Sequence, residues 1–293
     1  MESLGYKPST TLVRSRRTVA VSAWVFNPMA IVRHFRQHRY LLSQLARRNI
    51  QTQYRGSWLG TIWSLLTPLV MLGVYTFVFS VVFQSRWGNS TSTGRLDFAL
   101  NLFASLTAFN LFSQSLASAP SMILANQNYV KRVVFPLEVL PVARFCSNLV
   151  EMGLGFVVFV FVALVARGSL PWTIVLLPTA LVPLALWSLG GTFFLAALGV
   201  FIRDMQSVIN LSMTVLMFMS AVFFPLSAVP PGWQKLICFN PMVPILEDVR
   251  RVCLQGLMPQ WPTWSLTTAG GMLVAMAGLA WFMKLKTSFA DVL

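Results

Sequence analysis

Charge is scarce in this 293-residue chain, where only 10% of residues are charged. Soluble globular domains carry roughly 25% charged residues, so the chain lacks the charge that would cover a water-facing surface. Its hydrophobic share is 56%, and its mean hydropathy is +0.68. These values exclude a soluble globular fold and predict an all-α integral membrane protein, because helices satisfy their own backbone hydrogen bonds in lipid.

Residues that carry enzyme chemistry are also few: eight acidic residues, two histidines and three cysteines. Acid–base or metal-assisted catalysis needs several convergent polar groups. The acidic residues form no such cluster, since the neighbours Glu247 and Asp248 would point apart on a helix. His34 and His38 lie four residues apart on an arginine-rich segment without a third ligand nearby. We therefore expect neither an enzyme nor a metal site, although a membrane-embedded sugar transferase remains an alternative.

A nucleotide-binding loop is missing as well. No G-x-x-x-x-G-K-[ST] motif occurs in the chain, so a P-loop is excluded. Ion-coupled transporters bury several ionisable groups at mid-membrane, whereas Glu151 is the only acidic or basic residue inside a predicted span. Glu151 is within reach of Arg144, which favours a structural or gating contact over a proton relay. If transport is active, its energy has to come from another polypeptide.

Long uncharged segments are what the chain does contain. Five stretches of 30 residues or more lack charge, and a spanning helix needs about 20 apolar residues. A sixth, shorter segment becomes long enough when it is extended back through Glu151. We predict six spans within a single domain over residues 28–293: 58–83, 99–120, 145–166, 174–200, 205–225 and 264–283.

The formal net charge of +14 is distributed in favour of one side of the membrane. With the N-terminus inside, 16 of the 22 Lys and Arg residues are cytoplasmic, including ten that precede the first span. This follows the positive-inside rule and predicts that both termini are cytoplasmic. Membrane topology therefore explains the basic composition, and no nucleic-acid partner is expected.

Three segments outside the spans have recognisable patterns. Residues 1–27 read as a mobile basic tail, and Pro28–Tyr54 reads as a basic amphipathic helix in the headgroup plane or on a cytosolic partner. Asn126–Phe135 reads as a short basic helix that could transmit force from a soluble partner, or as a plain loop. In the proline-rich stretch 226–262, Asn240 and Pro241 predict a helix start, which we place in an outer re-entrant hairpin. Glu247 and Arg251 have the spacing of an ion pair on its polar face.

Aromatic residues are abundant, with 23 Phe, 10 Trp and 5 Tyr. Most membrane aromatics face lipid or pack between helices. A sharper hypothesis is that some line a sugar path, because aromatic faces offer apolar contact to pyranose rings without holding them tightly. The candidate path residues are Trp58, Trp63, Tyr75, Phe79, Phe109 and Phe112.

Residues 53–83 read QYRGSWLGTIWSLLTPLVMLGVYTFVFSVVF. This segment closely resembles the opening of polysaccharide-exporting permeases of the type-2 ATP-binding-cassette exporter family. NQNYVKRVVFPLEVLPVA at 126–143, FNPMVPILEDVRRVCLQG at 239–256 and the C-terminal FADVL resemble later parts of the same family in the same order. The resemblance covers nearly all of residues 30–293.

The resemblance implies a homodimer of six-span subunits in the bacterial inner membrane, each with a separate ATP-binding subunit. ATP and Mg would bind to that partner, and this chain would carry no cofactor. The implied cargo is a lipid-linked polysaccharide, with O-antigen preferred over capsule, teichoic acid or a small molecule. A membrane scaffold without cargo is a further alternative.

The resemblance implies the role of the coupling segment, and a mechanistic hypothesis built on it gives roles to further residues. The segment that couples to the ATPase would comprise Asn126, Gln127, Asn128, Tyr129, Val130, Lys131 and Arg132. A lipid pyrophosphate would enter beside Arg47, Arg48, Tyr54 and Arg55, because arginine suits phosphate; the bland alternative is that these residues only obey the positive-inside rule. The outer gate would comprise Glu247, Asp248, Arg250 and Arg251.

Overall fold

The computed structural model describes residues 27–53, 60–82, 94–130 and 135–292. Within these ranges the chain is helical and contains no strand. The predicted basic tail lies outside the described residues, except for Asn27. Three helical segments are long and apolar enough to span a membrane: Val139–Arg167, Trp172–Leu198 and Trp261–Ser288. The chain is therefore an all-α, multi-pass membrane protein.

Within the described residues, helical structure lies on each of the six predicted segments, although α10 ends at Met219, before the predicted end of the fifth span at residue 225. The other helices on these segments are shorter or less apolar: α3 (Trp63–Tyr75) with the following π-helix (Thr76–Val82), α4 (Gly94–Ala117) and α10 (Met205–Met219). Of the three long spans, α7 is Val139–Arg167 and α13 is Trp261–Leu285, and the middle one comprises a short 3-10 helix, α8 (Leu177–Ala180) and α9 (Val182–Leu198). Gly168 ends α7 with a φ of 72°, a conformation that glycine adopts without strain.

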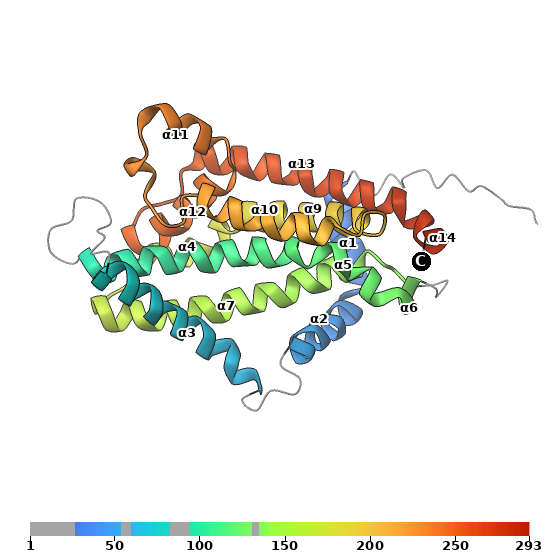
Figure 1. Cartoon of the computed structure of the whole chain (residues 1–293), viewed down its shortest axis with the longest axis horizontal. Helices are drawn as coiled ribbons and strands as arrows, with labels where there is room; N and C mark the ends of the chain where they lie inside the picture. Colours follow the sequence, from blue (N-terminus) through green and yellow to red (C-terminus); the bar gives the residue numbers. More distant parts are fainter. Residues whose placement is uncertain (1–26, 54–59, 83–93, 131–134, 293) are drawn as a thin grey trace, which may run out of the picture.

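The helices form an elongated bundle with distinct ends (Figure 1). One end holds α5 (Ala119–Met122), α6 (Gln127–Val130) and α14 (Phe289–Val292), while the other holds α11 (Pro231–Cys238) and α12 (Met242–Arg250). We call these the inner and outer ends, after the predicted topology.

The most closely packed pair in the bundle is α9 and α13, which glycine allows to approach closely. A Cβ on Gly190 would lie 2.6 Å from the backbone of Val274, and a Cβ on Gly278 would collide with the Gly190 carbonyl oxygen. The indole N–H of Trp187 also donates to the Thr267 carbonyl at 3.0 Å. Small residues at such a crossing let two backbones pack directly in a membrane protein.

The predicted amphipathic helix is two helices, which corrects the single element expected over Pro28–Tyr54. α1 (Pro28–Gln37) and α2 (Arg39–Gln53) are separated at His38, whose φ of −94° and ψ of 14° are not helical. The Asn27 side chain caps α1 by accepting from the Met29 N–H at 3.0 Å.

Candidate functional site

The apolar face of α1 and α2 packs against the bundle core, whereas the sequence pattern predicted that it would lie in the headgroup plane or on a cytosolic partner. Ile31, Phe35 and Leu42 are partly buried there, and Leu45 is buried. The α2 helix contacts α7 along this face. The polar face of α2 is thereby fixed against the inner end, where the predicted coupling segment lies.

Arg48 joins two regions that the sequence assigned to different roles. Its guanidinium donates to the Tyr129 hydroxyl at 2.6 Å and reaches the Asn126 side-chain oxygen at 3.5 Å. The guanidinium also lies over the Tyr129 ring, 5.8 Å from the centroid. A predicted cargo-binding arginine is therefore bonded to the predicted coupling segment.

The coupling segment, predicted as a helix over Asn126–Phe135, is described only in part, because residues 131–134 lie outside the described residues. Its described helical part is a 3-10 turn over Leu124–Asn126 followed by α6 (Gln127–Val130). Tyr129 stacks on Phe135 with ring centroids 4.4 Å apart.

A cavity of about 240 Å³ lies beside this contact, between α2, α5 and the start of α7. Arg48 and Arg144 both line it, together with the side chains of Ser118, Ser121 and Asn126. The Arg144 Nε donates to the Ser118 hydroxyl at 3.3 Å. We call this the basic cavity.

A second cavity, of about 260 Å³, lies between α3, α4 and α7. We call it the span cavity. Its walls mix aromatic rings with amide, hydroxyl and carboxyl groups, which is unusual between apolar helices. The aromatic residues are Trp63, Tyr75 and Phe103, and the polar ones are Gln53, Ser64, Thr67, Thr107, Asn110, Gln114, Asn148 and Glu151.

Two acceptors on the wall of the span cavity have no hydrogen-bond partner among the described residues. Asn148 is 2% exposed and donates through Nδ2 to the Ser115 hydroxyl at 3.0 Å, while its Oδ1 has no hydrogen-bond partner. One oxygen of Glu151 is also buried without a partner. Buried acceptors are normally satisfied, so these oxygens are placed to bond a hydroxyl-bearing molecule or water. Arg144 is near enough to interact electrostatically with Glu151, as the spacing predicted.

The predicted path residues are divided by the structure. Trp63 and Tyr75 line the span cavity, whereas Phe109 and Phe112 are 1% and 7% exposed within the core. Phe79 lies in the π-helix that follows α3. Tyr54, Arg55, Trp58, Lys131 and Arg132 are outside the described residues, and Arg47 is exposed on α2 without lining either cavity.

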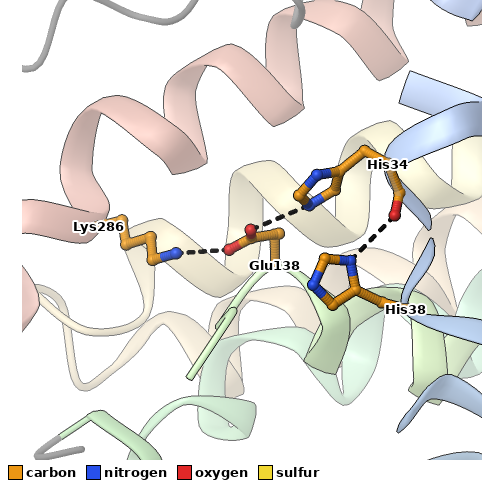
Figure 2. Close-up of polar contacts among 4 residues, drawn as sticks. All are labelled: His34, His38, Glu138 and Lys286. Atoms are coloured by element: carbon orange, nitrogen blue, oxygen red, sulfur yellow. Dashed lines mark hydrogen bonds and ion pairs between the residues drawn. The ribbon is translucent and has the colours of Figure 1, made fainter. Parts of the chain in front are cut away.

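Glu138 is a site that the sequence reasoning missed. Although it is only 3% exposed, its carboxylate contacts two distant segments (Figure 2). Lys286 Nζ donates to Oε2 at 2.6 Å, and His34 Nε2 lies 3.2 Å from Oε1. His38 makes no marked contact with this carboxylate in Figure 2 and donates through Nδ1 to the His34 carbonyl at 3.0 Å. The cluster joins α1, the start of α7 and the C-terminal end of α13.

The histidines therefore have structural contacts of their own. Their rings lie 4.7 Å apart and differ in their hydrogen-bond partners. Within the described parts of the chain, no group of three or more His, Cys, Asp or Glu side chains is arranged to hold a metal ion.

In the outer hairpin, some side chains that were predicted to lie on its polar face are buried. Arg250 is fully buried and donates to the Ala221 carbonyl at 2.9 Å and to Glu247 at 2.8 Å. The ion pair of Glu247 is thus made with Arg250, which corrects the predicted pair with Arg251; Arg251 donates to the Met258 carbonyl at 3.1 Å. The expected start is close to correct, since the Asn240 side chain accepts from the Met242 N–H.

Burial shifts the pKa of two ionisable groups in this hairpin, Asp248 and Arg250. Desolvation raises the pKa of the Asp248 carboxyl, although that carboxyl accepts a hydrogen bond from the Gln260 N–H at 2.8 Å. Desolvation also lowers the pKa of Arg250, against the attraction of Glu247. Both groups hold the hairpin against the bundle rather than facing outward.

Comparison with known proteins places this geometry in context. The family model described as ABC-2 type transporter matches residues 40–254. The O-antigen export system permease protein RfbA of Myxococcus xanthus is 27% identical over 264 residues, which cover 89% of this chain and 98% of the relative. A protein of the same name from Klebsiella pneumoniae is 25% identical, covering 86% and 95%.

A more distant relative is the polysialic acid transport protein KpsM of Escherichia coli, which is 21% identical over 84% of this chain and 93% of its own length. The family match includes α2 from residue 40 onward, α3, α4 and α7, which form walls of the two cavities. It also includes α11 and α12 of the outer hairpin. The chain therefore belongs to the ABC-2 type transporter family.

Proposed function

We propose that this chain is the membrane-spanning subunit of an ATP-driven exporter that moves a lipid-linked polysaccharide, with O-antigen as the preferred cargo, across the bacterial inner membrane. It works as a homodimer of six-span subunits with a re-entrant outer hairpin and cytoplasmic termini. Two copies of a separate ATPase bind ATP and Mg. Relatives named as O-antigen export permeases, which align with this chain over nearly their whole length, support this assignment.

The span cavity is the observation that carries the proposal. The oxygens of Asn148 and Glu151, which have no partner among the described residues, suit sugar hydroxyls, and the rings of Trp63 and Tyr75 suit the apolar faces of pyranoses. The surrounding helices are apolar, so the cavity offers a polar polymer a route that lipid does not. An exporter of a purely apolar cargo would gain nothing from these groups.

Coupling is proposed to run through α6 and α2, which the contact between Arg48 and Tyr129 joins in the cargo-free permease. ATP-driven closure of the partner pair pushes on both segments. The two permease subunits then part between their first and fifth spans, and the outer hairpin with Glu247, Asp248, Arg250 and Arg251 opens the exit.

Surface polysaccharide and intracellular lipid-linked polymer in a strain lacking this chain test the proposal. We expect loss of polymer outside with accumulation inside, both reversed by the wild-type chain. Complementation with Trp63→Ala should be impaired. Phe161→Ala also removes an aromatic ring, but Phe161 is 63% exposed on α7 and lines neither cavity, so this variant should restore export. If synthesis stopped without accumulation, the transferase alternative would replace this one, and unchanged polymer would point to small-molecule cargo.

Capsular polysaccharide is the second candidate cargo. The similarity to a polysialic acid transport protein supports it. The same strain distinguishes the two, because the polymer that accumulates inside identifies the cargo by its sugar composition.

A further inference from the structure

The basic cavity carries a positive charge that its surroundings leave uncompensated. Among the described residues, no carboxylate forms an ion pair with Arg48 or Arg144. The nearest acidic influence on Arg144 is Glu151, two turns further along α7 and on the span cavity. The remaining polar wall is supplied by neutral hydroxyl and amide groups. Two cations that converge without a counterion make a site for an anion.

We propose that Arg48 and Arg144 bind a diphosphate group in the basic cavity, and that the diphosphate displaces Tyr129 and Asn126 from Arg48. This inference rests on the proposed function, in which the cargo carries a lipid diphosphate. It adds Arg144 to the predicted entrance residues and gives that entrance a role in regulation.

The geometry favours a diphosphate over a smaller anion. The two guanidinium groups come from different helices, α2 and α7, and face one cavity of about 240 Å³. Ser118 and Ser121 add neutral hydroxyl groups on the α5 side. Arginine binds phosphate oxygens through paired N–H groups, so two arginines suit an anion with two phosphoryl centres.

Arg48 has a reason to exchange partners. Its present acceptors, the Tyr129 hydroxyl and the Asn126 amide oxygen, are both neutral. Both bonds already gain strength from the charge of Arg48, but an ionised diphosphate adds a Coulombic attraction that neutral oxygens lack. A diphosphate therefore competes well for Arg48, and its binding releases α6 from α2.

The release of α6 from α2 would signal to the ATPase that cargo is bound. Because Tyr129 belongs to the segment predicted to engage the ATPase, α6 is held by α2 only while the basic cavity is empty. The permease would then present α6 in different states with and without cargo, which is a coupling between two sites through one side chain.

Binding to the purified full-length permease in detergent tests this proposal. The probes are farnesyl diphosphate, farnesol and inorganic pyrophosphate, measured by isothermal titration calorimetry. We expect farnesyl diphosphate to bind and farnesol not to bind. Weaker binding of pyrophosphate would assign the site to a lipid headgroup, whereas equal binding would assign it to free phosphate and overturn the cargo role.

Variants distinguish binding at Arg48 and Arg144 from a general effect of positive charge on the protein. Arg144→Gln and Arg48→Gln should each weaken farnesyl diphosphate binding by about tenfold, the loss expected for one charge-assisted contact. Arg39→Gln, at an exposed position at the start of α2, should stay within twofold. Arg144→Lys should bind at an intermediate strength, and each variant should elute and unfold like the wild type.

Tyr129→Phe tests the exchange itself. Without the hydroxyl, Arg48 loses its 2.6 Å partner, so the diphosphate should bind more tightly, by about twofold to fivefold. Weaker binding in Tyr129→Phe, or unchanged binding in Arg144→Gln, would overturn the proposal. The assay needs no export, so a permease that binds the diphosphate through both arginines but exports no polysaccharide would contradict the proposed function alone.

Discussion

The two sides of the bundle are packed in opposite ways. Where α9 meets α13, Gly190 and Gly278 bring the backbones together and Trp187 bonds across the crossing. On α3 only Leu72 is buried, Pro68 interrupts the hydrogen-bond ladder, and a cavity lies between part of the helix and its neighbours α4 and α7. The α9–α13 pair therefore has the packing of a fixed scaffold, and α3 has that of an element that can move.

The outward face of α3 supports this contrast. Its exposed apolar side chains include Leu65, Leu69, Val70 and Val74, each more than 40% exposed. Such a face needs lipid or a second copy of the chain to cover it. The first span is also where the proposed homodimer parts, so the loosely packed side of the subunit is the one that the mechanism requires to move.

The largest effect on stability is expected from a substitution that disrupts the close packing of α9 against α13. Gly278→Val places a side chain against the Gly190 carbonyl, which is backbone and cannot turn away. Overpacking costs about 1–3 kcal/mol even where side chains can adjust, so we expect little folded protein. Gly73→Val on α3 meets open space and should accumulate normally. Yield and thermal unfolding of the detergent-extracted protein measure both, and equal behaviour of the two variants would remove the contrast.

Next in size is the loss of the Glu138 cluster, which ties the end of α13 to α1 and α7. Glu138→Gln weakens the contacts to both His34 and Lys286. We expect a loss of about 2 kcal/mol in the free energy of unfolding, because hydrogen bonds to charged groups contribute about this much. Chemical denaturation of the purified protein measures it. Asp204→Asn, an acidic residue exposed at the same end, is the control and should leave the unfolding unchanged.

A smaller effect on stability, but a clear one on transport, is expected at Pro68. Pro68→Ala restores a backbone N–H to α3 and straightens the helix beside the span cavity. The free energy of unfolding should change by less than about 1 kcal/mol, while export falls several-fold. Pro183→Ala makes the same exchange in the first turn of α9, where proline is tolerated, and should leave export intact. An equal loss of export in both variants would argue against a special role for α3.

The smallest effect concerns Asp248 in the outer hairpin. Because burial raises the folded-state pKa above the ordinary value of 3.8, ionisation opposes folding. Its stability contribution is therefore greatest below pH 3.8 and declines as the pH rises through the folded pKa. Asp248→Asn keeps an acceptor for the Gln260 N–H, so it should melt slightly higher than the wild type at pH 7.5 and not at pH 4. A variant that melts lower at pH 7.5 would contradict this account.

Much of the helical framework follows from the sequence. Uncharged runs locate the helices because lipid demands internal hydrogen bonding, and the apolar stripe of Ile31, Phe35, Leu42 and Leu45 identifies the face that packs. The polar contacts could not be predicted in this way. Glu138 meets partners 104 and 148 residues away, distances over which local spacing carries no information.

The outer hairpin shows the same limit at short range. Positions three and four residues apart are both neighbours on a helix, so the sequence alone could not choose between Arg250 and Arg251 as the partner of Glu247. The choice is made by the Ala221 carbonyl, which draws Arg250 inward. Among the path candidates, packing placed Phe109 in the core and Trp63 on a cavity, although both are aromatic residues in apolar helices.

The central claim is that the span cavity on α3 is a hydrophilic path rather than a gap filled by lipid. Accessibility to a membrane-impermeant thiol reagent tests it most directly, in a background where Cys146, Cys238 and Cys253 are replaced by serine. Thr67→Cys lies on the cavity wall, and Leu69→Cys lies on the apolar outer face of the same helix. The account predicts that Thr67→Cys reacts readily and Leu69→Cys hardly at all. Equal reaction at both positions, or faster reaction at Leu69→Cys, would contradict it.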